Sequence, residues 1–528
     1  MVDPYQVIIV GGGPVGVALA VELGLRGVTC ALVERRLVPQ RIPKGQNLTQ
    51  RTLEHFYFWG IVDQLRAARL LPPGYPIGGV TAYRDLMSDY WFASGGRESV
   101  RPYYFQANER LPQYLTEEVL RARLADCPSV TTLFGWAAAT VDQDDSGVRV
   151  TIVEDGGTSS RVLESAYAVG CDGARSTVRE QLGIDRGGRD FDERMVLAVF
   201  RSRELHEGLK RFPDRTTYRV LHPDLKGYWQ FFGRIDVGEG WFFHAPVPRD
   251  SSPETYDFQG LVQRAGGFSF ACSFDYVGFW DLRIAVASRY RQGRVFIAGD
   301  AAHSHPPYGG FGLNSGLEDV VNLGWKLAGV LHGWGGDGLL ESYTQERQPI
   351  FVETGEAMIA GGIEADRHFL ERYSPERDRD EFARAWKELE ISSGARQQSY
   401  EPHYEGSSVV DGPAGAACSI HGRYTFEAQA GHHLSPQPLS SGRNVFEELG
   451  TGYSLLAFDV REPHVRAFEE AASLLCVPLK VIRDTFDAPR AEYASRMVLV
   501  RPDQYVVWAG DEPPRDVVQL MRKATGCV

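Results

Sequence analysis

The sequence lacks several features that define whole classes of protein. Its seven cysteines are scattered, odd in number and never spaced as CxxC, which argues against a disulfide framework and against a cysteine metal site. No hydrophobic run approaches the roughly 18 residues that cross a bilayer, and the first residues show no basic region or cleavage site of a signal peptide. We therefore expect a cytoplasmic protein with no membrane partner.

Positive charge is also scarce. The 56 lysines and arginines face 69 aspartates and glutamates, which gives a formal net charge of −13 at pH 7. Such a surface repels phosphate backbones, so we expect no nucleic-acid partner. The 528 residues are 43% hydrophobic and 24% charged, which are ordinary values for globular proteins. A chain of this length is enough for about three or four domains.

The opening segment predicts the start of a parallel sheet. A short apolar strand over residues 6–10 leads into the turn GGGPVG and a helix over residues 14–26, and a second strand over residues 28–33 follows. This order is a βαβ unit. A strand over residues 295–298 and a helix over residues 314–331 bring back the same character late in the chain. The first domain is therefore predicted to be discontinuous.

The middle and the end of the chain differ in composition from the first segment. Residues 77–104 and 191–285 are rich in aromatic and β-branched residues broken by turn residues, which favours antiparallel strands. A charged segment with a proline suggests a linker at 376–400, and a βαβββα order compatible with a thioredoxin-like sandwich follows it. We predict an α/β protein of three domains, namely a Rossmann-like domain (1–76, 105–190 and 286–375), an antiparallel β-sheet substrate domain (77–104 and 191–285) and a thioredoxin-like C-terminal domain (401–528).

The turn after the first strand carries a dinucleotide-binding motif. Gly11 permits the tight turn, Gly13 lets a pyrophosphate approach the backbone, and Gly16 lets the helix pack on the strand. The helix N-terminus then faces the phosphates. Glu34 ends the second strand about 20 residues further on, where a carboxylate accepts hydrogen bonds from an adenosine ribose. The motif alone does not distinguish NAD from FAD.

Two further turns follow predicted strands. In GDAAH, which begins at Gly299, Asp300 is placed to accept a hydrogen bond from a ribityl hydroxyl. The glycine-rich loop before Asn314 offers backbone N–H groups that suit the pyrimidine edge of an isoalloxazine. The third turn, GCDGARS, holds Asp172, and an Asp-Gly pair alone is a routine turn.

Together these motifs resemble those of a known family. GxGxxG with a distal acid, then the DG turn, then GDAAH followed by PP and GxGLN, is similar to the class A flavoprotein monooxygenases. These are the aromatic and phenol hydroxylases related to p-hydroxybenzoate hydroxylase. The resemblance covers about residues 1–370, and LVRPDQYVVW at 499–508 resembles the thioredoxin-like tail of phenol-hydroxylase-type members. That tail lacks CxxC, so no redox chemistry is expected there.

The resemblance implies FAD as the bound cofactor. Glu34 would hold the adenosine ribose and Asp300 the ribityl chain, with Gln113 beside the flavin side chain and Asp172 linked to FAD and nicotinamide handling. Where relatives usually carry an arginine this chain has Lys44, for which Arg35 or Arg41 would compensate. The full predicted FAD-binding set is Gly11, Gly13, Pro14, Val15, Gly16, Glu34, Arg35, Lys44, Gln113, Asp172, Gly299, Asp300, Gly312, Leu313 and Asn314.

The resemblance also implies a reaction. In the family NADH or NADPH reduces the flavin, O2 adds at C4a, and an electron-rich aromatic ring attacks the resulting hydroperoxide. Only one dinucleotide motif is present, so the nicotinamide is expected to visit transiently. An ionised phenol is the better nucleophile, and a side chain must help it ionise. Pro307 is expected beside the reacting face, and the candidates for assisting the substrate are Tyr104, Tyr218, Arg219, Trp229 and His244.

Other interpretations stay open at this point. A flavin-dependent halogenase shares the first motif, but its WxWxIP signature is missing. A non-catalytic FAD-binding protein is the alternative from a different class. His303 and His305 form an HxH pair, yet no third ligand cluster is visible, so we predict no metal. The expected partners are a small aromatic substrate, O2 and NAD(P)H, and a homodimer is common in the family.

Overall fold

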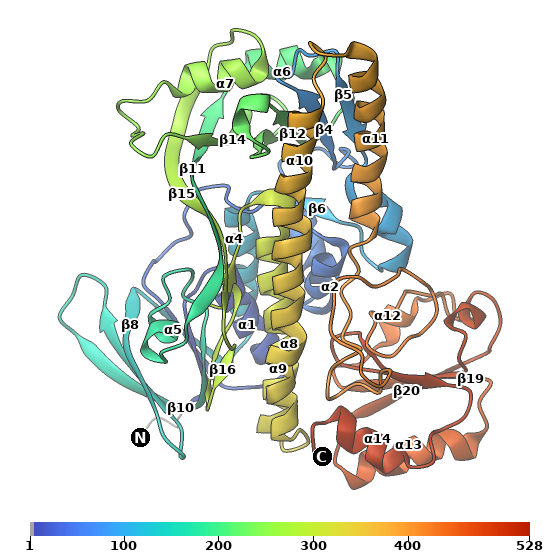
Figure 1. The fold of residues 1–528 in the computed structure, drawn as a ribbon. Coiled ribbons are helices and arrows are strands. Elements are labelled where there is room, and N and C mark those ends of the chain that lie inside the picture. Colours follow the sequence, from blue (N-terminus) through green and yellow to red (C-terminus); the bar gives the residue numbers. More distant parts are fainter. Residues whose placement is uncertain (1–4, 528) are drawn as a thin grey trace.

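The computed structural model describes residues 5–527, except for the side chains of residues 395–397, and is built around three large sheets and one two-stranded sheet (Figure 1). The first sheet lies with the N-terminus at the lower left of the view, and the second rises above it on the long strands β11 and β15. The third lies at the lower right, beside helices α8 and α9. The mixed α/β class predicted from the sequence is confirmed.

The first sheet has a parallel core of five strands in the order β17-β10-β1-β2-β7. The meander β8-β9 pairs antiparallel with β10, and β16 closes the other edge. Helices α1, α4 and α8 pack beside one another on this sheet. The bounds are β1 (Tyr5–Val10), α1 (Pro14–Leu25), β2 (Cys30–Glu34), α4 (Gln113–Leu124), β7 (Val130–Phe134), β8 (Trp136–Gln143), β9 (Val148–Glu154), β10 (Ser160–Gly170), α5 (Thr177–Gln181), β16 (Arg291–Gln292), β17 (Val295–Ile297) and α8 (Phe311–Leu331).

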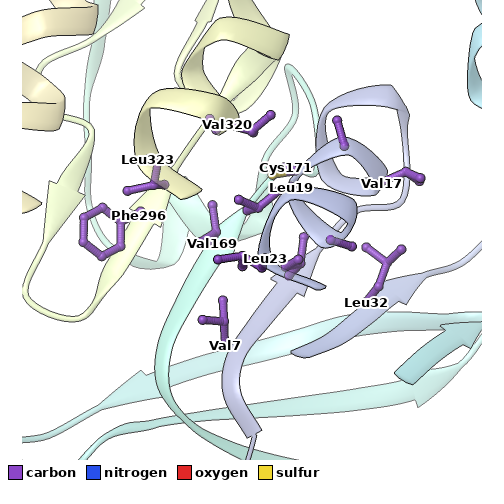
Figure 2. Close-up of a cluster of buried hydrophobic side chains, with 14 of the residues drawn as sticks. Val7, Val17, Leu19, Leu23, Leu32, Val169, Cys171, Phe296, Val320 and Leu323 are labelled. Carbon is purple, nitrogen blue, oxygen red and sulfur yellow. The ribbon is translucent and has the colours of Figure 1, made fainter. Parts of the chain in front are cut away.

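The core of this region is an apolar layer between the sheet and its helices. Figure 2 shows side chains from β1, α1, β10, β17 and α8 meeting in one cluster, including Val7, Leu19, Val169, Phe296 and Leu323. All five are fully buried. Burying a large aliphatic side chain stabilises a fold by roughly 1.5–3 kcal/mol. This cluster therefore joins segments more than 300 residues apart in sequence into one rigid support.

The second sheet has eight strands in the order β18-β15-β11-β14-β13-β12-β4-β5. Its pairs are antiparallel except for β12 and β4, which run parallel. Helices α6 and α7 contribute to the core on one face, and the turn from α9 to α10 packs on the other. The bounds are β4 (Gly79–Tyr83), β5 (Trp91–Ser94), β11 (Arg186–Arg201), α6 (Arg203–Gly208), β12 (Thr217–Leu221), β13 (Gln230–Arg234), β14 (Gly240–Val247), α7 (Phe258–Gly266), β15 (Ser273–Ala287) and β18 (His303–Ser304).

Two predictions for this region need correction. The strands expected through residue 104 stop at β5, and a 3₁₀ helix, η1 (Gly96–Tyr103), follows the Gly95-Gly96 pair. The linker expected at 376–400 instead contains helix α11 (Arg379–Gln398). Phe382 and Trp386 of α11 pack on Tyr83 of the second sheet and on Phe369 of α10. The charged sequence is the solvent side of this amphipathic helix.

Long helices stand between the sheets. Helix α9 (Asp337–Glu353) continues through a π-helical segment (Thr354–Ala360) into α10 (Gly361–Arg372), and together they form the upright pair with α11 in Figure 1. Within residues 5–527 we find no helix with the length and apolar character of a membrane span. The short elements near the first sheet are β3 (Asn47–Leu48), α2 (Gln50–Phe58), α3 (Val62–Ala67) and β6 (Glu109–Arg110).

The C-terminal sheet has the order β20-β19-β21-β22. Strands β19 and β20 are parallel and joined by α13, whereas β21 and β22 form an antiparallel hairpin followed by α14. This is the βαβββα order expected from the sequence, and the thioredoxin-like assignment stays a prediction. The bounds are α12 (Val445–Glu448), β19 (Tyr453–Phe458), α13 (Glu462–Leu474), β20 (Leu479–Asp484), β21 (Met497–Val500), β22 (Val506–Gly510) and α14 (Val517–Ala524).

Candidate active site

Three turns that are far apart in sequence meet at one edge of the first sheet. The last residues of β1, β10 and β17 are register partners, because Val10 pairs with Gly170 and Gly170 pairs with Ile297. The turns after these strands therefore emerge side by side. A Cβ placed on Gly11 would lie 2.4 Å from the carbonyl oxygen of Cys171, and one on Gly299 would lie 2.9 Å from Val15. The glycine-rich turn, the DG turn and the GDAAH turn thus lie side by side, and we call the region that they border the cleft.

The first turn presents an open phosphate cradle. Gly11 has a φ of +102°, a conformation that favours glycine. Gly16 is required because its Cβ would lie 1.8 Å from the Gly11 carbonyl oxygen. Gly13 differs from both, since a Cβ there would meet nothing within 4 Å. It precedes Pro14 at the start of α1, where no side chain caps the free N–H groups. Open space at an uncapped helix N-terminus suits a pyrophosphate.

Glu34 lies beside this cradle, as the motif requires. Its Oε2 accepts a hydrogen bond from the Gly12 N–H at 2.7 Å, and its Oε1 accepts one from the Arg36 N–H at 2.8 Å. Arg121 of α4, which the sequence analysis did not single out, donates from Nη2 to the Gly12 carbonyl oxygen at 3.2 Å. A guanidinium therefore borders the cradle. The only signal for it in sequence was its place on the same helix as Gln113.

Asp300 has the properties expected of a ligand-binding carboxylate. No hydrogen bond from residues 5–527 reaches its side chain, which opens to solvent in the cleft. Partial enclosure by the protein still raises its pKa, against the opposing effect of His303, Arg186 and Lys44. Asp172 differs, because its carboxylate accepts hydrogen bonds from the Ser176 hydroxyl and the Val178 N–H. Asp172 thus shapes the DG turn and is less free to bind a ligand.

The start of α8 closes the far end of the cleft. Its N-cap is Gly310, in the left-handed conformation with φ of +72°, and no side chain caps the helix. A Cβ on Gly45 would lie 3.2 Å from Leu313 and 3.3 Å from the Gln113 side chain, so these predicted residues do meet. A Cβ on Gly312 would lie 3.7 Å from His305. The free N–H groups of the first turn of α8 suit an electron-rich ligand edge.

Asn314 has a structural role at this point. Its Oδ1 accepts hydrogen bonds from the Thr49 N–H at 2.9 Å and the Thr52 hydroxyl at 2.7 Å. Its amide group donates to the carbonyl oxygens of Asn47 and Gly310. Because the side chain is fully used, it fixes the start of α8 against α2 and leaves only backbone contacts for a ligand.

The basic residues predicted for the phosphates are all solvent-exposed. Lys44 makes one contact of 3.3 Å, to the side chain of Gln40. Arg41 makes a 3.5 Å ion pair with Glu118 and is 79% exposed. Arg35 is exposed at the end of β2. Each can turn toward a bound phosphate, and none is held in place beforehand.

One face of the second sheet forms an aromatic wall beside the cleft. Phe242 and His244 alternate with residues of the opposite face on β14, and His244 contacts Phe231 and Trp280 with ring centroids 5.0 and 5.7 Å apart. Tyr308, directly after Pro307, joins the loop to this wall by stacking on Trp229 at 4.5 Å. Pro307 therefore lies where the GDAAH loop meets the aromatic wall.

His244 is the predicted candidate that the wall presents to the cleft region. It is 3% exposed, and neither ring nitrogen has a hydrogen-bond partner of good geometry among the described residues, although the Val196 backbone lies nearby. Burial lowers its pKa to about 3. Arg219 and Trp229 lie on the same side but both bind the Asp366 carboxylate, at 2.9 and 2.7 Å. Arg219 and Trp229 therefore already have a hydrogen-bond partner, whereas the ring nitrogens of His244 have none of good geometry among the described residues.

Two further candidates do not lie on the aromatic wall. Tyr218 points to the other face of the sheet, where its hydroxyl accepts two hydrogen bonds from Arg234. Strand alternation puts it opposite Arg219, and sequence alone could not say which face carries the wall. Tyr104 packs with Tyr424 and His433, and it also lines a cavity with Phe311 and Asn314 at the start of α8. Tyr104 therefore stays a candidate, whereas Tyr218 faces away from the wall.

The predicted HxH pair does not form a shared ligand set. His303 Nε2 binds Asp319 at 2.6 Å, and His305 Nδ1 binds the Pro306 carbonyl oxygen at 2.7 Å. Elsewhere, the structure does bring His403, Glu405 and His432 within 4.8 Å of one another. Both nitrogens of His432 are taken by Glu401 and Glu405, and its ring stacks parallel to that of His403. This arrangement is that of an ionic cluster.

Comparison with known proteins agrees with this geometry. Residues 4–356 match the model of the FAD binding domain. The chain belongs to that family. It is 29% identical over 518 residues to the rifampicin monooxygenase of Streptomyces venezuelae, with 96% of each chain covered. It is 28% identical over 536 residues to 4-methyl-5-nitrocatechol 5-monooxygenase of a Burkholderia species, covering 97% of this chain and 95% of the relative.

Solved structures extend the similarity to the whole chain. Aklavinone-11 hydroxylase in complex with FAD and aklavinone superposes with a TM-score of 0.83 at 25% identity, covering 99% of this chain and 100% of the other. The monooxygenase PieE in complex with FAD and substrate gives a TM-score of 0.83 at 26% identity, with 99% and 98% covered. The protein is an FAD-dependent monooxygenase of the aromatic hydroxylase type. The open cradle at Gly13 and the unpaired carboxylate of Asp300 fit its cofactor.

Proposed function

We propose that this monooxygenase hydroxylates a phenolic or similarly electron-rich aromatic compound at the aromatic wall, using O2 and NAD(P)H. The observation that carries the proposal is His244, a buried imidazole without a good hydrogen-bond partner among the described residues, set among Phe231, Phe242 and Trp280. Aromatic walls with one convergent polar group are typical of sites for flat apolar ligands. Relatives named for 4-methyl-5-nitrocatechol and for aklavinone support this class.

The cofactor would lie along the cleft. Gly13 and the start of α1 would bind the pyrophosphate, Glu34 the adenosine ribose and Asp300 the ribityl chain, with the start of α8 at the pyrimidine edge. When bound, FAD supplies electron transfer from NAD(P)H and the activation of O2. The protein supplies position and a water-poor surface, because the wall residues Phe231, Phe242 and His244 are each 9% exposed or less.

His244 would act on the substrate hydroxyl as a neutral imidazole. With a pKa of about 3 it carries no charge near pH 7, so one ring nitrogen accepts and the other donates a hydrogen bond. An accepting nitrogen aimed at a phenol orients the ring through a hydrogen bond, and with so low a pKa it leaves the proton on the phenol. The loop after Pro307 then fixes the edge of the ring, since Tyr308 is stacked on Trp229 of the same wall.

Turnover in labelled oxygen tests this proposal. Protein saturated with FAD should oxidise NADH or NADPH faster when a phenol or catechol is added, and with ¹⁸O2 the product should gain one ¹⁸O atom. Comparing NADH with NADPH also identifies the electron donor. Oxidation of the nicotinamide that no aromatic compound accelerates, with hydrogen peroxide as the only product, would refute the proposed substrate class.

Several finer features stay predictions. We keep the three-domain division, with its thioredoxin-like C-terminal domain, and treat α11 as part of the packing on the second sheet. A homodimer and a cytoplasmic location are carried forward from the sequence analysis. Light scattering on the full chain measures the first, and localisation of the tagged full chain measures the second.

A further inference from the structure

Arg110 is a buried arginine that has no ion-pair partner among the described residues. It lies in β6, the short strand that pairs with β3, and is 2% exposed. Its Nη1 donates a hydrogen bond to Asn47 Oδ1. Its Nε and Nη2 have no hydrogen-bond partner among residues 5–527, and no carboxylate in that range forms an ion pair with it. Burial alone lowers its pKa to about 9.

Other buried arginines show how unusual this is. Arg51 pairs with Glu54 and Glu318, Arg347 with Asp319, and Arg501 with Glu346 and Asp503. Burying an ion without a partner destabilises a fold strongly. A chain that leaves two guanidinium donors unpaired at a site of this kind is arranged for an anionic group that arrives from outside the protein.

The direction of Arg110 places that group at the junction of the cleft and the aromatic wall. Its guanidinium carbon lies 5.7 Å from the ring centroid of Phe242, on the wall. Asn47, its hydrogen-bond partner, lies against the start of α8, since a Cβ on Gly310 would lie 3.1 Å from the Asn47 amide. Arg110 therefore sits between the substrate wall and the pyrimidine end of the cleft.

We propose that Arg110 forms an oxyanion-binding subsite at the inner end of the active site. The subsite rests on the proposed function, and it narrows the substrate class to aromatic compounds that carry an ionised oxygen, either a carboxylate or a phenolate. A guanidinium binds such a group through paired N–H donors. The pyrimidine carbonyl oxygens of FAD present the same chemistry and are the second source that the experiment must distinguish.

The test uses the variants Arg110→Met and Arg110→Lys, with Arg234→Met as a matched control. Arg234 is also a buried arginine of this region, but its donors are paired with Tyr218, His206 and the Arg215 carbonyl oxygen. FAD affinity is measured by fluorescence on reconstituting the apoprotein. Ligand affinity is measured from the flavin absorbance change with 2-naphthoate and with its neutral analogue 2-naphthamide.

If the substrate is the source, Arg110→Met weakens 2-naphthoate by about 10- to 100-fold, the range for a hydrogen bond to a charged group, and leaves 2-naphthamide and FAD unchanged. Arg110→Lys recovers part of this because it keeps the charge but not the fork. If flavin is the source, the FAD dissociation constant rises by a similar factor instead. Arg234→Met should lower the melting temperature without either effect.

Unchanged affinity for FAD together with no loss of preference for 2-naphthoate over 2-naphthamide would overturn the subsite. The same holds if wild-type protein shows no such preference and its FAD constant is insensitive to position 110. These are binding measurements, so they remain decisive even if turnover fails and the proposed reaction is wrong. A subsite that passes while hydroxylation fails would leave the binding claim standing alone.

Discussion

The cleft and the interface between α8, α9 and the C-terminal region both hold polar side chains, but the side chains of the interface are paired and those of the cleft are not. In the interface, Glu346 of α9 accepts hydrogen bonds from Arg501 at 2.7 and 3.0 Å and from Lys326 at 2.7 Å. Arg501 in turn binds Asp503. In the cleft, Asp300, His244 and Arg110 lack such partners. The paired charges stabilise the fold, whereas we interpret the unpaired polar side chains as ligand-binding groups.

Helix α8 shows both treatments along its length. Its first turn leaves backbone N–H groups free at the cleft. One turn further on, Glu318 binds Arg51 and His55, and Asp319 binds His303, Arg347 and the Gly299 N–H. The second group ties the GDAAH turn to α9 and α2. The hydrogen-bond network of Glu318 and Asp319 therefore holds in place the helix whose first turn has free N–H groups.

The largest expected effect comes from breaking the paired side. Arg501→Met leaves the Glu346 and Asp503 carboxylates short of a buried partner, which should lower the free energy of unfolding by about 3–5 kcal/mol. Thermal and urea unfolding measure this. The exposed pair Arg461–Glu512 is the control, and Arg461→Met should cost at most about 1 kcal/mol. Equal effects of the two variants would contradict the comparison.

The same network predicts an acid transition. Although burial opposes it, Arg501 and Lys326 hold the pKa of Glu346 well below its usual value. A carboxyl group with a depressed pKa stabilises the fold above its unfolded pKa of about 4.3 and loses that contribution as pH falls. Wild-type protein should therefore lose stability below about pH 4.5 more steeply than Glu346→Gln. Parallel curves of melting temperature against pH for the two proteins would show that Glu346 is not responsible.

A substitution of an unpaired side chain in the cleft should instead reduce ligand affinity. Asp300→Ala removes the carboxylate proposed for the ribityl chain, which should weaken FAD by about 1.5–3 kcal/mol, or roughly 10- to 150-fold. Stability of the apoprotein should hold or improve, because no hydrogen bond within residues 5–527 is lost. Asp281→Ala, in the exposed part of β15, is the control. An unchanged FAD dissociation constant would show that Asp300 is misassigned.

The smallest effect is expected at His244. His244→Gln replaces one neutral hydrogen-bonding side chain by another of different shape, so affinity for a phenolic ligand should fall by about 1 kcal/mol, near fivefold. Because the pKa of His244 is about 3, the variant should leave the pH dependence of turnover between pH 6 and 9 unchanged. A pH optimum that moves in the variant would show that His244 titrates during the reaction.

Local motifs in the sequence predicted the three turns that meet at the edge of the first sheet. The glycine spacing, Glu34 and the GDAAH turn are read from neighbouring residues, and the structure brings their turns together as strand order requires. Features that depend on distant pairing could not be predicted. Arg110 meets Asn47 across 63 residues, and Arg501 meets Glu346 across 155. Nothing local in either sequence segment says whether such an arginine will find a carboxylate.

The sequence did not predict helix α11 or the face of the sheet on which Tyr218 lies, and the reason is similar. The segment at 376–400 looked like a charged linker because its apolar residues, Phe382 and Trp386, are sparse and gain meaning only against Tyr83 of the second sheet. Tyr218 and Arg219 alternate on one strand, and the choice of face depends on which side α6 and α7 cover. In both cases tertiary packing determines the structure and overrides the preference of the local sequence.

A crystal structure of the protein with FAD and 2-naphthoate would locate the flavin and the anionic ligand together. We expect one flavin along the cleft, with its pyrophosphate at Gly13, its ribityl chain at Asp300 and an anionic or carbonyl oxygen within about 3.2 Å of Arg110 Nε or Nη2, an ordinary hydrogen-bond distance. Flavin density in a different cavity, or a complex in which Asp300 and Arg110 still face no ligand atom, would contradict this expectation.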